Sequence, residues 1–397
     1  SASRNGAPLW RQHRHRHGGR PRSNEAMSSP GSTSVRAAVL RGVGEPMVVE
    51  PIELEAPGPH DVRVRIAASG VCHSDLSVQN GSLPFMFPTV LGHEGAGVVE
   101  AVGPAVTRVA PGDHVVLTWM PPCRGCFWCL AGQPMLCERG LAESLGGAYA
   151  TVGGTPLVRG LGTATFAEKT LVPEGEVIVV DRSVPLELAA LVGCALSTGI
   201  GAVWHTARAT PGSSVAVVGC GGVGLSVIQG ARLAGASTIV AIDRVADKLE
   251  TALALGATAV VDASKDNPVE AVRTLTGGRG ADYGFEVVGR SDAIRDTYAM
   301  TRRGGTTVLV GAGSPSDPVS FSAFELFVDA KTLVGCVYGS TDPDRDFPTL
   351  VDLVRTGAID AAGMVSRRIC LDDVNEAFRA MEAGEVARSV IVFDGAD

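Results

Sequence analysis

The sequence predicts an α/β protein with two domains, one β-rich and one built on a doubly wound parallel sheet. At 397 residues the chain exceeds the usual size of a single hydrophobic core. Short strand-like segments separated by Pro and Gly turns fill the part before about residue 200, whereas apolar strands alternate with helical segments after it. The 45% hydrophobic and 19% charged residues are the balance of a globular chain.

The first domain is expected over residues 35–200. Val62, Val64 and Ile66 alternate with charged residues, which is the period of a half-buried strand, and they follow a Pro-Gly-Pro turn. Further strands are predicted at 98–99 and 114–117. We expect the C-terminal segment 340–397, with a helix at 374–381 and a strand at 389–393, to complete this domain.

The second domain is expected over residues 201–339. Helices are predicted at 223–234 and 246–255, and strands are predicted at 214–219, 238–243, 258–261, 285–288, 307–310 and 333–338. Strands that alternate with helices run parallel and pack into a sheet covered on both faces.

A glycine-rich string of the form G-x-G-x-x-G lies between the first predicted strand and helix of this domain, and it consists of Gly219, Cys220, Gly221, Gly222, Val223 and Gly224. The first glycine allows a tight turn, the second lets the backbone approach a pyrophosphate, and the last lets helix and strand pack closely. The helix N-terminus then directs free N–H groups at the phosphates. The context favours a dinucleotide site over a structural glycine turn.

The nature of the dinucleotide is indicated by Asp243, which ends the next predicted strand 24 residues after Gly219. Its carboxylate accepts hydrogen bonds from ribose hydroxyls and repels a 2′-phosphate, so NAD is expected. Arg244 follows directly and would suit that phosphate, so NADP is the alternative.

Four cysteines are spaced C-x2-C-x2-C-x7-C: Cys123, Cys126, Cys129 and Cys137. Four thiolates within fifteen residues suit a closed tetrahedral zinc site, which has no place for a substrate, so we expect a structural zinc. An iron–sulfur cluster and a disulfide-linked loop are the alternatives.

A second group is dispersed along the chain. Cys72, His93 and Cys194 would make a three-ligand zinc site whose fourth position is open, as a catalytic zinc requires. Spacing alone is only suggestive, because a lone cysteine is often a buried apolar residue. With the four-cysteine loop, this group predicts two zinc ions per chain.

From about residue 35 onward the chain resembles the zinc-dependent alcohol dehydrogenases of the medium-chain dehydrogenase/reductase superfamily. The resemblance is carried by the Gly-His-Glu motif around His93, the four-cysteine loop, the motif around Cys194 and the string at 219–224. It implies a GroES-like catalytic domain, a Rossmann domain, a small alcohol or aldehyde as substrate and a homodimer. The stretch between Cys137 and Phe166 resembles the longer dimeric members, including the thiol-adduct formaldehyde dehydrogenases.

The resemblance also assigns roles by position. It makes Cys72, His93 and Cys194 the ligands of the catalytic zinc, and it places Glu94 beside that metal, exchanging on and off it. Asp75 would orient the His93 imidazole.

Further roles that the resemblance implies concern the alcohol and the cofactor. Ser74 would accept the alcohol proton. Where several relatives place a histidine to pass this proton on, the chain has Ser77, which is no base near neutral pH. The implied cofactor contacts are His73, Thr198, Val223, Asp243, Lys248 and Arg388.

The resemblance assigns three positions to the lining of the substrate pocket. Trp119 replaces a smaller side chain and would narrow the region near the zinc, whereas Gly160 and Ala312 would open space further out. We therefore expect an elongated pocket.

Charge and hydropathy argue against a nucleic-acid-binding protein and against a membrane-spanning protein. The net charge of −8 and the lack of a basic face argue against nucleic acid, and no run of 18 uncharged apolar residues indicates a membrane span. The first 26 residues carry six Arg and one Glu, and we expect residues 1–34 to be a disordered extension, with a transit peptide as the alternative. Nine clustered cysteines without a secretory signal predict a reducing compartment, the cytoplasm.

Three rival functions stay open at this stage. The same site would serve a formaldehyde dehydrogenase or nitrosothiol reductase that depends on glutathione or mycothiol. A zinc-binding nucleic-acid module would use the four-cysteine loop, but that loop lacks a dense basic run. A catalytically silent relative would have no need for the dispersed ligand set.

Overall fold

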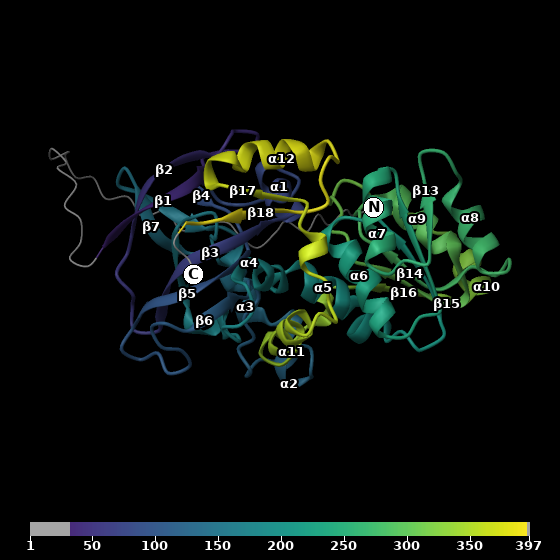
Figure 1. Ribbon diagram of the computed structural model, residues 1–397, viewed down its shortest axis with the longest axis horizontal. Coiled ribbons are helices and arrows are strands. Elements are labelled where there is room, and N and C mark those ends of the chain that lie inside the picture. Colours follow the sequence, from purple (N-terminus) through teal and green to yellow (C-terminus); the bar gives the residue numbers. More distant parts are fainter. Residues whose placement is uncertain (1–31, 395–397) are drawn as a thin grey trace, which may run out of the picture.

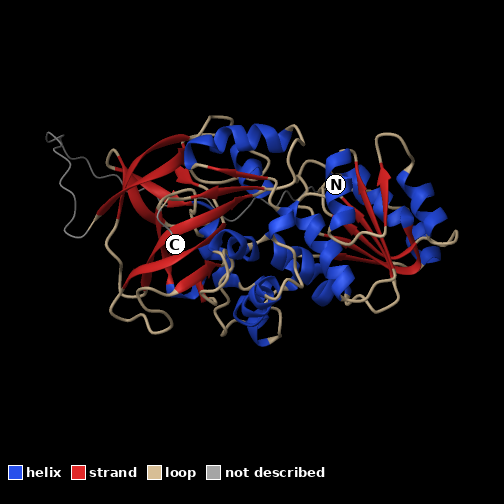
Figure 2. Ribbon diagram, in the orientation of Figure 1, coloured by secondary structure: helices blue, strands red, loops and turns tan. Residues whose placement is uncertain are grey.

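The computed structural model describes residues 32–394, which form two domains joined by a helical region (Figure 1). Strands gather at the two ends of the molecule, and helices lie between them (Figure 2). The chain passes from the first domain to the second and then returns, because its last helices and strands lie against the first domain (Figure 1).

The first domain contains a closed barrel and a larger sheet. The barrel strands, in order of pairing, are β1 (Thr33–Leu40), β2 (Val48–Leu54), β7 (Ala148–Val152), β8 (Thr155–Arg159) and β4 (Thr89–Val90). Because β1 begins at Thr33, residues 33 and 34 belong to a strand and not to the expected extension. The expectation for residues 1–31 lies outside the described residues.

The larger sheet of the first domain carries the first ligand candidates. Its order is β10 (Val177–Val179), β6 (His114–Leu117), β5 (Glu94–Val102), β3 (Asp61–Val71), β18 (Ser389–Val392) and β17 (Arg367–Ile369), and β9 (Lys169–Pro173) also pairs with β3. Val62, Val64 and Ile66 of β3 are buried in one core cluster, as their alternation predicts. Strands β3 and β5 are antiparallel with Gly70 opposite Glu94, so the end of β3 lies beside the start of β5.

The second domain is a six-stranded parallel sheet. Its order is β13 (Ala259–Asp262), β12 (Thr238–Asp243), β11 (Ser214–Val218), β14 (Ala281–Glu286), β15 (Thr301–Leu309) and β16 (Thr332–Gly335). Its helices are α6 (Gly222–Leu233), α7 (Ala246–Ala254), α8 (Pro268–Leu275), α9 (Ser291–Met300) and α10 (Ala323–Asp329). The strand order reverses at β11, the place where a doubly wound sheet binds its ligand.

A helical joint connects the domains. It comprises α4 (Leu186–Ala189), the short helix Ala190–Gly193, α5 (Ala195–Gly201), the π-helix Ala202–Ala207 and α11 (Pro343–Arg355). The predicted boundary between residues 200 and 201 falls inside α5, within the continuous helical run from α5 into the π-helix. The C-terminal helix α12 (Val374–Glu382) precedes β18, which pairs with β3.

No single helix among residues 32–394 has the length and apolarity to cross a membrane. One bent pair, Leu186–Gly193 with Ala195–Ala207, meets the length and composition criteria together, but it is bent by 52°. Ala190, Leu191 and Ile200 of this pair are buried in the main core cluster, so its apolar character is explained by packing.

The last strand of the second domain is shorter than predicted. β16 ends at Gly335, and Tyr338–Ser340 forms a tight turn in place of the end of the predicted strand 333–338. All three residues of the turn have positive φ, with values of 52°, 67° and 52°. Contacts with the helical joint, described below, hold this turn.

Candidate active site and metal centres

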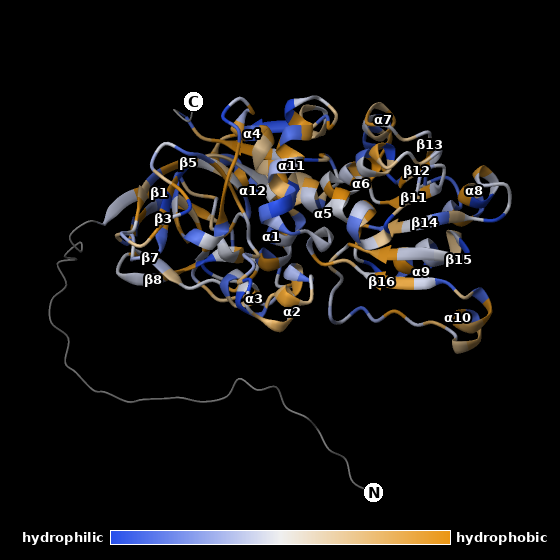
Figure 3. Cartoon of the chain, turned by 90° about the horizontal axis from the view of Figure 1, so that it is seen from below, coloured by the Kyte–Doolittle hydropathy of each residue, from blue (hydrophilic) through white to orange (hydrophobic). Residues whose placement is uncertain are grey.

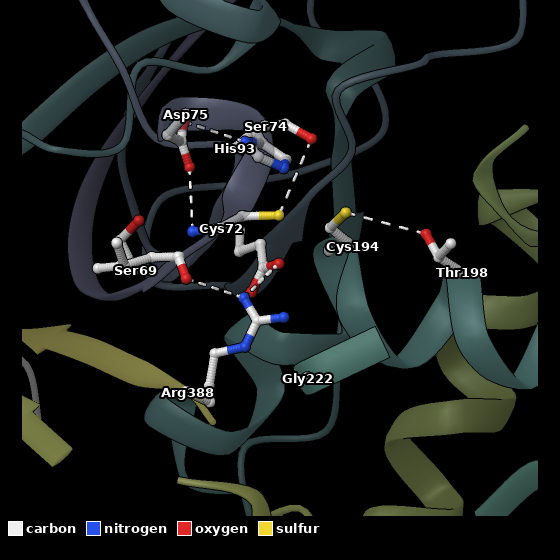
Figure 4. Close-up of polar contacts among 12 residues, drawn as sticks. Ser69, Cys72, Ser74, Asp75, His93, Cys194, Thr198, Gly222 and Arg388 are labelled. Carbon is white, nitrogen blue, oxygen red and sulfur yellow. Dashed lines mark hydrogen bonds and ion pairs between the residues drawn. The ribbon is translucent and has the colours of Figure 1, made fainter. Parts of the chain in front are cut away.

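Four buried side chains from distant parts of the sequence meet where the two domains join (Figure 4). Cys72 follows β3, His93 and Glu94 lie at the start of β5, and Cys194 precedes α5. Their ligand atoms all lie within 4.8 Å of one another. The structure therefore brings together the dispersed set that the sequence singled out.

The His93 ring is fixed by Asp75, a fully buried residue of α1 (His73–Gln79). The Asp75 Oδ1 atom lies 3.2 Å from His93 Nδ1 and accepts the Gly92 N–H at 2.9 Å. Its Oδ2 atom accepts the Cys72 N–H at 3.2 Å. A proton on Nδ1 satisfies this contact and leaves Nε2 with a free lone pair for a metal.

The thiols of Cys72 and Cys194 are a coupled pair. A hydrogen bond from Cys194, helped by the nearby His93 and Arg388 charges, holds the pKa of Cys72 well below its usual range. The same contact raises the pKa of Cys194. A buried thiolate in such surroundings is the form of cysteine that binds metal.

Glu94 is held beside this cluster by Arg388. The Arg388 Nη1 atom donates to Glu94 Oε1 at 2.9 Å and to the Val71 carbonyl at 3.1 Å. Burial raises the pKa of Glu94 to about 8, although Arg388 opposes the shift. Glu94 Oε2 is buried without a hydrogen-bond partner among the described residues, so one carboxylate oxygen beside the cluster is free to act as a further ligand.

The donor set fits a catalytic zinc. Two thiolates, one imidazole and an adjoining carboxylate are ligands that zinc prefers, and Cys72, His93 and Cys194 alone leave one coordination position open.

The second cluster joins Cys123, Cys126, Cys129 and Cys137, whose sulfur atoms also lie within 4.8 Å of one another. Backbone N–H groups point at the sulfurs, for example Cys126 N at 3.3 Å from Cys123 Sγ and Gly140 N at 3.3 Å from Cys137 Sγ. Such backbone hydrogen bonds lower the pKa of Cys126 to about 6. None of the four forms a disulfide among residues 32–394, and the geometry suits a closed four-thiolate zinc site.

The glycine string forms the turn from β11 to α6. Gly219 has a φ of 97°, a conformation that side chains disfavour. The space beside Gly221 is open, so a ligand can approach its backbone, whereas a Cβ on Gly224 would lie 1.8 Å from the Gly219 carbonyl oxygen. α6 begins at Gly222, with Val223 half-buried in its first turn.

Arg388 links this turn to the metal cluster. A Cβ on Gly222 would lie 2.0 Å from Arg388 Nη2, so the guanidinium lies against the first turn of α6 (Figure 4). Its Nε atom is buried without a partner in the described part of the chain. Arg388 therefore lies beside the glycine turn, and the shorter of its two hydrogen bonds goes to Glu94.

Asp243 ends β12 beside the same turn. Its Oδ2 atom accepts the Cys220 N–H at 2.7 Å, and its Oδ1 atom accepts the N–H groups of Arg244 and Val245 at 2.7 and 3.1 Å. Asp243 and Lys248 are half-buried, and Arg244 is exposed.

Comparison with known proteins decides the family. Residues 58–182 match the model of the alcohol dehydrogenase GroES-like domain, and residues 222–356 match the model of the zinc-binding dehydrogenase. The chain is similar to S-(hydroxymethyl)glutathione dehydrogenase of Paracoccus denitrificans, with 37% identity over 90% of this chain and 99% of the relative. It is equally similar, at 37%, to an NDMA-dependent alcohol dehydrogenase of Amycolatopsis methanolica, over 90% of this chain and 98% of that protein.

The chain belongs to the zinc-dependent alcohol dehydrogenases of the medium-chain dehydrogenase/reductase superfamily. Solved structures agree: benzyl alcohol dehydrogenase of Acinetobacter calcoaceticus matches with a TM-score of 0.85 and 32% identity, over 91% of this chain and 99% of that one. A zinc-binding alcohol dehydrogenase domain protein of Burkholderia ambifaria matches with a TM-score of 0.86 and 36% identity, over the same shares.

The remaining predicted residues of this dehydrogenase lie around the cluster. Ser74 is half-buried, and its Oγ atom lies 4.0 Å from Cys72 Sγ. Thr198 Oγ1 lies 3.8 Å from Cys194 Sγ (Figure 4). His73 is exposed at the start of α1 and makes no hydrogen bond or ion pair within residues 32–394.

The three pocket positions of the dehydrogenase have different outcomes. Trp119 lies beside the metal cluster, with its ring 6.4 Å from His93 in an edge contact. Ala312 is exposed after β15. The expectation that Gly160 opens space is wrong, because a Cβ there would lie 2.2 Å from the Val90 carbonyl oxygen.

Sequence reasoning missed Tyr338 of this dehydrogenase. Its ring packs against Trp119 in a tilted arrangement, with 4.5 Å between centroids and 45° between the ring planes, and its hydroxyl donates to the Gly193 carbonyl, directly before Cys194. The Gly-Ser-Thr-Asp-Pro run at 339–343 is typical of a turn and was the available signal.

Replacing Asp75 by Asn tests the orientation of His93. The amide cannot accept all three N–H groups, so we expect zinc affinity at the Cys72 cluster to fall about 10- to 100-fold while the four-cysteine site keeps its metal. Chelator titration with zinc counting measures both sites. Asp373→Asn is the matched control, because Asp373 caps Cys370 in the same way at an exposed position. The role given to Asp75 would be contradicted if the variant released both zinc ions at the same chelator concentrations as the wild-type protein.

Proposed function

We propose that this dehydrogenase oxidises an alcohol to an aldehyde or ketone, and catalyses the reverse reduction, with NAD as the hydride acceptor. The observation that carries the proposal is the convergence of Cys72, His93 and Cys194 within 4.8 Å, beside a carboxylate that Arg388 holds. That arrangement leaves a coordination place for the substrate oxygen.

A zinc ion bound there supplies a Lewis acid that polarises the alcohol oxygen and lowers its pKa. The protein supplies orientation and the proton acceptor. Asp75 fixes His93, and the Ser74 hydroxyl, whose Oγ atom lies 4.0 Å from Cys72 Sγ, is placed beside the cluster to relay the alcohol proton. A serine is no base near neutral pH, so Ser74 would accept the alcohol proton only as it passes its own hydroxyl proton on to water, and Ser77 cannot be the final proton acceptor.

The cofactor proposal rests on Asp243 and the turn at 219–224. The turn offers its backbone and the start of α6 to a pyrophosphate, and the unpartnered Arg388 Nε is a further donor beside it. The Asp243 carboxylate favours free ribose hydroxyls over a 2′-phosphate. One relative is named NDMA-dependent, so NDMA belongs among the acceptors to be tested.

A second candidate function is the oxidation of a formaldehyde–thiol adduct. It is favoured by the similarity to S-(hydroxymethyl)glutathione dehydrogenase, which is as high as the similarity to the alcohol dehydrogenase relative. The same metal cluster would serve both reactions.

The reaction is tested with purified zinc-loaded protein and a panel of alcohols. We expect two zinc ions per chain and NAD reduction without added thiol. Cys194→Ala should lose one zinc ion and about three orders of magnitude in kcat, because the Lewis acid is lost. Cys370→Ala, at an exposed cysteine outside both clusters, is the control. Turnover that requires glutathione or mycothiol would select the second candidate.

Cofactor choice is tested by Asp243→Asn. Loss of the negative charge removes charged hydrogen bonds to the ribose, so we expect the ratio of NAD to NADP affinity to fall by about 10- to 100-fold. Isothermal titration with both dinucleotides measures it. Asp262→Asn, at the end of the neighbouring strand β13, is the control. An unchanged ratio would be incompatible with the role given to Asp243.

We also propose that the dehydrogenase acts as a homodimer in the cytoplasm. Support for the dimer comes from β16, which within residues 32–394 is an edge strand paired with β15 alone, and from α10, where Phe324 and Phe327 are 74% and 82% exposed. Figure 3 shows this apolar helix at the border of the second domain. Two copies of β16 related by a two-fold axis would cover both the strand edge and the phenylalanines.

Phe327→Glu tests this interface. The substitution places one glutamate in each copy, so two negative charges enter the interface. We expect the dissociation constant of the dimer to rise by roughly 30-fold or more, and sedimentation at micromolar concentration should then show a monomer. Leu253→Glu, on the exposed face of α7, should leave the dimer intact. A wild-type monomer, or a variant that stays dimeric, would refute the interface.

A further inference from the structure

The four-cysteine loop, residues 123–137, is exposed and has little core of its own. Helix α2 (Phe127–Leu130) has no buried residue, and Phe127 is 69% exposed. A segment of this kind owes its rigidity to the metal that its cysteines bind. It is therefore a stiff support that contacts the rest of the protein through the buried Pro134, through Met135, which packs against the main core cluster, and through Arg124.

Arg124 joins the loop to α11 through a pair of hydrogen bonds to one carboxylate. It follows Cys123 with a φ of 59°, a left-handed conformation that is unfavourable for a non-glycine residue. Its guanidinium forms a fork on Asp342, with Nη1 donating to Oδ2 at 2.8 Å and Nη2 to Oδ1, and Nη2 also contacts Asp344. Arg108 pairs with the same Asp344. A forked network fixes geometry better than a single surface ion pair.

Asp342 ends the turn that follows β16. The turn Tyr338–Ser340 has three successive positive φ values, two of them at residues other than glycine, and such a conformation persists only where its surroundings hold it. Asp342 begins α11 as its N-cap, and its N–H donates to Asp346 at 2.8 Å. Arg124 thus anchors the C-terminal end of the turn.

The other end of the turn contacts the residue directly before the ligand Cys194. The Tyr338 hydroxyl donates to the Gly193 carbonyl, directly before Cys194. The Thr341 hydroxyl donates to the Ser197 carbonyl of α5 at 3.1 Å. The place of Cys194 is therefore set partly by this turn.

We propose that Arg124 is a positioning residue, through which the metal-bound four-cysteine loop holds segment 338–342 against Gly193 and so fixes Cys194 in the catalytic cluster. The kinetic part of this inference rests on the proposed dehydrogenase function. Reacting groups tolerate displacements of only about half an ångström, so a slack turn slows the hydride step without unfolding the protein.

Hydrogen exchange tests the inference without any activity. In the full-length, zinc-loaded protein, Arg124→Ala should raise amide exchange about tenfold or more in residues 338–342 and 193–198, with both zinc ions retained. Arg355→Ala is the matched control, because Arg355 lies at the other end of α11 and is 43% exposed against 44% for Arg124. Unchanged exchange in residues 193–198, or an equal change in the control, overturns the inference.

Kinetics separate positioning from simple stabilisation. Arg124→Ala should lower kcat about tenfold with little change in the KM for NAD, and it should raise the primary deuterium isotope effect with deuterated alcohol. Arg124→Lys, which keeps the charge without the fork, should recover part of kcat. A lower melting temperature with unchanged kcat and isotope effect overturns the inference.

Asp342→Asn provides a second test of the same contact in case Arg124→Ala loses the zinc of the four-cysteine loop. Asp342 lies outside that loop, so its substitution leaves the four cysteines and their neighbours unchanged. It should reproduce the exchange and kinetic changes, and the double variant should add little to either single one. Additive effects overturn the coupling. A wild-type protein without dehydrogenase activity would refute the proposed function, whereas the exchange comparison would still decide the role of Arg124.

Discussion

The catalytic cluster depends on one buried carboxylate. Asp75 accepts N–H groups from Cys72, Gly92 and the His93 ring, so a single side chain joins the end of β3 to the approach to β5. Two metal ligands are thereby placed before any metal binds. The third ligand, Cys194, lies in the helical joint. The position of the joint therefore determines the geometry of the metal cluster as much as the first domain does.

Sequence patterns predicted the parts of the structure that local chemistry determines. The strand–turn–helix from β11 to α6 was found to within a few residues, because glycines and apolar periodicity mark it directly. Both ligand clusters were found because cysteine and histidine carry the metal chemistry themselves. Gly160 and Tyr338 were misjudged because their conformations depend on partners in other segments, the Val90 carbonyl and the Gly193 carbonyl, which no local pattern reveals.

Arg388 lies between the metal cluster and the glycine turn at 219–224. Its guanidinium donates to Glu94 and lies against Gly222 at the start of α6. Among the described residues its Nε atom has no hydrogen-bond partner. One buried side chain therefore contacts an element of each domain.

Strand β18 lies between β3 and β17, and Arg388 directly precedes it. Arg388 comes 294 residues after its partner Glu94. A ribosome therefore synthesises the whole parallel sheet of the second domain before it synthesises the strand that completes the earlier sheet. Until β18 has been made, residues 68–71 of β3 lack their partner strand and Glu94 lacks its counter-charge, so the metal cluster cannot take its final form before this late segment is in place.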